Sequence, residues 1–81
     1  MRTERKYLVT TEDKEQRVIK FLELDHPNHY GNGKLIYIQN LKTKDDNVID
    51  VRYQKYNFQT ICENWIKDYY GKNLLSYEMQ N

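Results

Sequence analysis

Metal ligation is the first chemistry to weigh in this sequence, because Asp25, His26 and His29 form an Asp-His-x-x-His cluster. Carboxylate oxygens and imidazole nitrogens both bind zinc, but a zinc site takes three or four protein ligands. Cys62 would be a distant fourth ligand only if this segment folded back onto a buried helix face. Two histidines at this spacing are also common by chance. We therefore expect a solvated loop, no metal and no cofactor.

A phosphate cradle is the second chemistry, suggested by Gly31, Gly33 and Lys34. The nucleotide-binding pattern G-x-x-x-x-G-K-[ST] lies between a strand and a helix. Here Lys34 is followed by Leu35 and an expected strand, so the pattern does not fit. The glycines are better explained by a loop that uses their freedom at positive φ.

Nucleophilic and acid–base chemistry also lack an assembled set of groups. Cys62 lies beside Ile66 on an apolar stripe, whereas a catalytic thiolate needs an exposed, electropositive site. The carboxylates of Asp45, Asp46 and Asp50 surround an expected turn exposed to water, whereas acid–base catalysis needs a desolvated carboxyl group. We expect a core cysteine, a wet turn and no enzymatic activity.

Aromatic and basic residues form the most suggestive group in the chain. They are Tyr7, Tyr37, Tyr53 and Tyr56 together with Arg5, Lys6, Lys34, Arg52 and Lys55. On a sheet face, tyrosines stack on unpaired bases and arginines contact phosphates. No RNA-recognition motif is present, however, and acidic residues dilute the positive charge. Tyrosine also replaces scarce aliphatic residues in the core, which is the reading we prefer for most of them.

The composition restricts the class of protein further. The 81 residues, with 13 Lys+Arg and 12 Asp+Glu, fit one domain over residues 1–81 without a linker. No apolar run approaches a membrane span or a signal peptide, so no membrane partner is expected. A single cysteine suits a reducing, cytoplasmic setting. Alanine is absent and Lys, Asn, Ile and Tyr are abundant, which favours an AT-rich bacterial, phage or plasmid gene.

An amphipathic helix is predicted between Asn57 and Gly71. Apolar residues recur at i, i+3, i+4, i+7, i+8 and i+11. Asn57 suits the N-cap, Gly71 suits the left-handed position after the helix, and Lys67 and Lys72 complement the helix dipole. The expected core stripe consists of Phe58, Ile61, Cys62, Trp65, Ile66 and Tyr69.

Strands are predicted over residues 6–10, 34–40 and 48–53, with a charged turn over 41–47. Residues 12–24 support either a turn and a strand over 16–24 or a second helix. We favour the hairpin, because the apolar residues of this segment lie only in its second half. Residues 74–77 could add an edge strand or a short helix. The expected fold is α+β: an antiparallel meander of three to four strands packed against one C-terminal amphipathic helix.

A binding function follows from this architecture, because no motif identifies a family and no catalytic site is evident. If the helix covers one sheet face, Leu35, Tyr37 and Val48 leave the other face unusually apolar. We expect this face to bind a protein partner or a second copy of the chain. Size and composition suggest a phage or mobile-element inhibitor or regulator of a host protein, for example an anti-CRISPR or other anti-defence protein. The alternative is a single-stranded nucleic-acid-binding module. The residues expected to bind are Leu35, Tyr37, Arg52, Tyr53, Lys55 and Tyr56.

Overall fold

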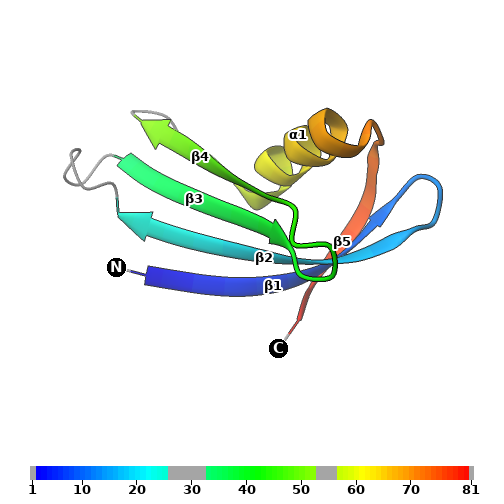
Figure 1. The fold of residues 1–81 in the computed structure, drawn as a ribbon, viewed down its shortest axis with the longest axis horizontal. Helices are drawn as coiled ribbons and strands as arrows, with labels where there is room; N and C mark the ends of the chain where they lie inside the picture. The colour runs from blue at the N-terminus through cyan, green and yellow to red at the C-terminus, as the bar shows by residue number, and fades with distance from the viewer. Residues whose placement is uncertain (1, 26–32, 53–56, 81) are drawn as a thin grey trace.

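The computed structural model describes residues 2–25, 33–52 and 57–80 (Figure 1). The described segments form a five-stranded antiparallel sheet and one helix, which confirms the predicted α+β class. Their bounds are β1 Arg2–Thr11, β2 Gln16–Asp25, β3 Gly33–Asn40, β4 Asp46–Arg52, α1 Phe58–Tyr70 and β5 Leu74–Gln80.

The strands lie in the order β4-β3-β2-β1-β5, so β1 to β4 form the predicted meander. The last strand, β5, does not pair with β4 but with β1, at the other edge of the sheet. The C-terminal segment therefore supplies a fifth strand, where the sequence left open an edge strand or a short helix. The connection from β4 to β5 therefore joins the two edges of the sheet, and its helix α1 lies on one face (Figure 1).

The segment over residues 12–24 forms a hairpin and not a second helix. The Thr11 N–H donates to the Glu15 carbonyl at 3.0 Å, and the Lys14 N–H donates to the Thr11 carbonyl at 2.8 Å. Lys14 closes this turn in the left-handed region, at φ 70°. From Gln16 onward the chain pairs with β1 on one side and β3 on the other. The β-branched and aromatic residues of this half favour that central strand position.

Both predicted ends of α1 are present in the structure. The Asn57 side chain accepts a hydrogen bond from the Thr60 N–H at 2.8 Å. Gly71 adopts φ 67°, and its N–H donates to the Lys67 carbonyl at 2.9 Å. The left-handed conformation satisfies a terminal carbonyl of the helix at little steric cost, because glycine has no Cβ.

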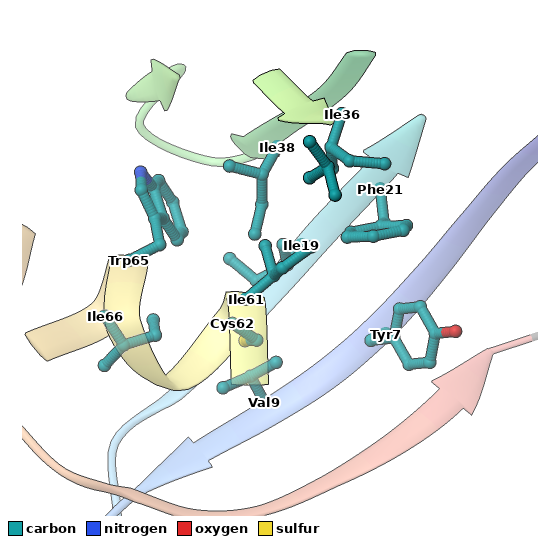
Figure 2. Close-up of a cluster of buried hydrophobic side chains, with 11 residues drawn as sticks. Tyr7, Val9, Ile19, Phe21, Ile36, Ile38, Ile61, Cys62, Trp65 and Ile66 are labelled. Atoms are coloured by element: carbon teal, nitrogen blue, oxygen red, sulfur yellow. The ribbon is translucent and has the colours of Figure 1, made fainter. Parts of the chain in front are cut away.

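The core lies between α1 and one face of the sheet (Figure 2). Strand alternation sends every second residue of β1 to β4 to this face, and α1 contributes its apolar stripe. The buried apolar side chains are Tyr7, Val9, Ile19, Phe21, Ile36, Ile38, Val51, Ile61, Cys62, Trp65 and Ile66. Phe58 is partly buried, and its ring stacks on Tyr7 with centroids 3.7 Å apart.

Tyr69 departs from the predicted core stripe, because its side chain is 52% exposed. At this end of α1 the stripe faces the β3–β4 turn instead of the sheet interior. The Tyr69 hydroxyl donates to the Asp45 carboxylate at 2.8 Å, and the neighbouring Tyr70 packs against the core. A tyrosine in such a place keeps its ring on apolar atoms and its hydroxyl at polar ones.

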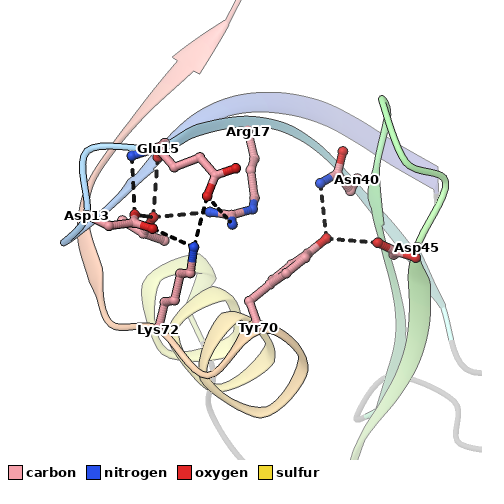
Figure 3. Close-up of polar contacts among 8 residues, drawn as sticks. Asp13, Glu15, Arg17, Asn40, Asp45, Tyr70 and Lys72 are labelled. Carbon is pink, nitrogen blue, oxygen red and sulfur yellow. Dashed lines mark hydrogen bonds and ion pairs between the residues drawn. The ribbon is translucent and has the colours of Figure 1, made fainter.

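Polar contacts hold the C-terminal end of α1 between two hairpin turns (Figure 3). On one side, the Lys72 ammonium binds the carboxylates of Asp13 and Glu15 at the β1–β2 turn. On the other side, the Tyr70 hydroxyl accepts from the buried Asn40 amide at 3.0 Å and donates to Asp45 at 3.2 Å. Each contact joins residues far apart in the sequence, so the helix end is fixed relative to both turns.

Replacing Trp65 by alanine should destabilise the fold strongly, because its indole is 4% exposed and packed under α1. Large-to-small substitutions of buried tryptophan cost about 3–5 kcal/mol. The measurement is urea unfolding of Trp65→Ala, followed by circular dichroism. Leu75→Ala, at a side chain 52% exposed on β5, is the control and should change stability by less than about 0.5 kcal/mol. Equal midpoints for the two variants would contradict the packing described here.

Lys72→Met should lower the thermal midpoint at neutral pH and lose this effect in acid. The Lys72 ammonium lowers the pKa of Asp13 and of Glu15 from their ordinary values of 3.8 and 4.5. Carboxyl groups with a lowered pKa stabilise the fold above their unfolded values, and that stabilisation fades as the pH falls through the folded pKa. The midpoints of variant and parent should therefore converge as the pH drops below about 4. Lys42→Met, in the exposed β3–β4 turn, is the control. A difference in thermal midpoint between Lys72→Met and the parent that grows in acid would contradict this explanation.

Candidate functional surface

The face of the sheet opposite α1 carries a patch of apolar side chains. Ile36 and Ile38 are buried on the helix side, so Leu35 and Tyr37 point to the other side. The register places Leu22, Tyr37 and Val48 side by side on β2, β3 and β4. The adjacent row contains Leu24 and Leu35. We refer to the five residues Leu22, Leu24, Leu35, Tyr37 and Val48 as the open-face patch.

The patch is accessible over the described residues. Four of its side chains are partly buried by their neighbours within the sheet, and Val48, on the edge strand, is 59% exposed. In the part of the chain that the structure describes, no helix or strand packs on this face. Contiguous apolar surface of this kind is unusual on a monomer and is typical of an interaction site.

Tyr37 is held in place at the centre of the patch. Its hydroxyl donates to the Asp46 carboxylate at 2.7 Å, and this bond raises the pKa of Tyr37. The Lys20 ammonium lies 5.4 Å from the centre of the Tyr37 ring, which is within reach of a cation–π attraction. A tyrosine side chain already held by its hydroxyl and by a contact at its ring loses little conformational freedom when a partner binds.

The structure brings together only part of the predicted binding set. Leu35 and Tyr37 lie on the open-face patch. Arg52 ends β4, and its side chain is outside the description; Tyr53, Lys55 and Tyr56 lie outside the described residues. The prediction for those four residues stays untested.

Leu22 and Leu24 were missed as patch residues. Their signal is the alternation within residues 18–24, where Ile19 and Phe21 take one face and Val18, Leu22 and Leu24 take the other. Both faces of this strand are apolar, so the pattern could not tell which one the helix would cover.

The tyrosines grouped by the sequence analysis do not share one face. Tyr7 is 5% exposed on the helix side, where it stacks on Phe58. Tyr37 lies on the opposite side of the sheet. A base-stacking platform needs neighbouring exposed rings, and these two tyrosines do not provide one.

The residues considered for metal and acid–base chemistry have structural partners where they are described. Asp25 forms an ion pair with Lys34, which lowers the pKa of the Asp25 carboxyl to about 2. His26 and His29 lie outside the described residues. Asp45 accepts hydrogen bonds from Thr43 and Tyr69, and these lower its pKa. Among the described residues no cluster of metal-ligating groups occurs.

Comparison of the chain with protein-family models, with curated proteins and with solved structures finds no match. In the described segments, α1 is too short and too polar to cross a bilayer.

The Cys62 thiol should be unreactive in the folded protein. Its side chain is 0% exposed, and burial raises its pKa to about 12. Because the thiolate is the reactive form, a disulfide reagent should label native protein slowly and unfolded protein rapidly at mildly alkaline pH. A Leu75→Cys variant, with its new thiol at an exposed position, should show one fast and one slow phase. Rapid labelling of the parent protein would contradict a core role for Cys62.

Proposed function

We propose that this protein is a non-enzymatic binding protein and that its open-face patch docks onto another protein. The supporting observation is the accessible apolar patch itself, on a sheet whose other face is filled by α1. The sheet keeps the five side chains in fixed positions, and burying them against a partner would be favourable. Tyrosine in particular is enriched among the residues that dominate protein–protein binding energy.

The described charges around the patch are of both signs, which favours a protein over a nucleic acid as the partner. The described ionisable side chains on this face include Lys6 and Lys20 but also four carboxylates. These carboxylates belong to Glu4, Asp46, Asp50 and Glu78. Binding to nucleic acid depends on neutralising phosphates with an excess of basic residues. A mixed ring of charges around an apolar centre is instead the usual anatomy of a protein interface.

The biological form that we propose is an inhibitor or regulator that occupies a site on a larger host protein in a reducing compartment. The small rigid sheet and the absence of alanine, which suggests an AT-rich phage or mobile element, support an anti-defence role. A buried free thiol agrees with a reducing compartment.

The test is affinity capture with the tagged protein and two matched variants. Val48→Lys puts a charge into the open-face patch, and Leu75→Lys puts the same charge on the other edge strand at similar exposure, 52% against 59%. A host protein should be retained by the parent and by Leu75→Lys, and should bind Val48→Lys about tenfold more weakly. Nuclease treatment should leave it bound.

Three results would overturn the proposal. The retained protein could bind both lysine variants equally, which would place the contact elsewhere. Retention of the host protein could depend on nucleic acid; a steep loss of binding with rising salt would then support a single-stranded nucleic-acid-binding module. Finally, sedimentation could show a dimer of this chain that Val48→Lys separates, with no other protein retained; the patch would then be covered by a second copy.

A further inference from the structure

A pocket of about 330 Å³ lies between α1 and the edge strand β4. Its apolar part is formed by Ile49 from β4 and by Ile61 and Trp65 from α1. Its polar lining consists of Asn47, Asn64, Asp68 and Tyr69. No described residue of β3 lines it, so the pocket lies over the outermost strand, at the edge of the sheet. It is separate from the open-face patch, which is on the other side of the sheet.

One residue of the pocket lining, Trp65, has a buried hydrogen-bond donor with no partner among the described residues. The Trp65 side chain is 4% exposed, and its indole N–H meets no acceptor among the described residues. Figure 2 shows the nitrogen on the side of the ring away from Ile66. A buried N–H without an acceptor is costly, and most buried tryptophans find one. A ligand oxygen that reaches this N–H from the pocket would supply the missing acceptor.

The backbone of β4 offers further hydrogen bonds beside the pocket. The Asn40 N–H donates to the Asp45 carbonyl at 2.8 Å, and bonded pairs alternate along an antiparallel ladder. The pair Tyr37–Val48 is thus a non-bonded pair, and the N–H and C=O of Val48 point away from β3. In agreement, the Val48 N–H donates to the Asn47 side chain at 2.9 Å. An incoming strand can replace that single side-chain acceptor.

We propose that this pocket binds the side-chain amide of a glutamine or asparagine, carried by an extended peptide that adds to the edge of β4. The amide oxygen accepts from the Trp65 indole N–H, and the amide NH₂ donates to the Asp68 carboxylate. The methylene groups contact Ile49 and Ile61. The proposal is independent of the open-face patch and would give the protein a second binding site.

The pocket lining favours an amide over a carboxylate, an ammonium group or a hydrocarbon. A carboxylate would satisfy the indole N–H but would be repelled by Asp68, the carboxylate among the described lining residues. An ammonium group would pair with Asp68 but has no acceptor for the indole N–H. A hydrocarbon would leave the N–H unpaired. Of these four groups, only the amide provides an acceptor and donors together.

Small probes of equal length test the pocket itself. The chain has one tryptophan, so its indole N–H gives a single, assignable cross-peak in a ¹⁵N–¹H spectrum. Titration with butyramide should shift this cross-peak saturably, whereas butyrate and butylammonium should leave it in place. Asp68→Ala, at an exposed position, should weaken the response to butyramide and keep the peak. An unmoved cross-peak, or equal shifts with all three probes, would overturn the proposal and leave the pocket to water.

A peptide pair tests strand addition. Acetyl-Thr-Val-Gln-Val-Thr-amide should bind about tenfold more tightly than the same peptide with leucine at its centre. Val48→Pro removes the outward N–H at an edge position where proline is tolerated, so it should weaken the glutamine peptide and leave the butyramide response unchanged. The proposed strand addition would be overturned if the two peptides bound equally well. It would also be overturned if the glutamine peptide bound the parent and Val48→Pro equally well. Val48→Lys changes the open-face patch but retains this N–H. If this variant no longer binds the host protein but still responds to butyramide, the two binding sites are separate.

Discussion

The return of the chain from β4, at one edge of the sheet, to β5, at the other edge, is the constraint on which the rest of the structure depends. The chain leaves the sheet at β4 and returns to it at β5, beside β1. The helix of this connection lies on one face of the sheet. Its first residue, Phe58, contacts Tyr7 of β1 and Tyr77 of β5, and its apolar stripe covers the core. Ile61, Cys62, Trp65 and Ile66 meet residues from the meander strands along this path. A domain of this size buries little surface, so the fold has few other contacts with which to compensate for their loss.

Polar contacts fix the C-terminal end of α1, beyond the buried part of its apolar stripe. At the C-terminal end of α1 the sheet interior ends, and both hairpin turns bind the helix end, one through Lys72 and the other through Tyr70. The Arg17 guanidinium lies 4.4 Å from the centre of the Tyr70 ring and donates to Thr11, which links the two groups of contacts. Exposed ion pairs stabilise a protein weakly when they are alone. Their place at the helix end lets them fix the direction in which β5 leaves α1.

Local patterns predicted most of the elements, whereas the pairing of distant segments escaped them. The helix and its caps follow from the spacing of Phe58 to Tyr69, from Asn57 and from Gly71, because these signals lie within the element itself. The strand at residues 74–80 was left open, since its partner β1 is some seventy residues away. The exposure of Tyr69 has the same origin: its spacing is that of a core residue, but the group that it meets is the β3–β4 turn. Leu22 and Leu24 could not be assigned to a face, because β2 is apolar on both sides.

One helix on five strands leaves an asymmetric molecule, and both proposed sites arise from that asymmetry. The helix covers one face, so the other keeps the open-face patch. At β4 the helix overlies the last strand, so a pocket lies between them and the outward backbone groups of β4 lie beside it. Unpaired strand edges are a risk for aggregation, and proteins usually block them with charges or side chains. The bond from the Val48 N–H to the Asn47 side chain is a block of this kind, and a peptide carbonyl could replace its acceptor. An edge protected in this way resists pairing with unrelated strands, but it can pair with a segment that also places a side chain in the pocket beside Trp65.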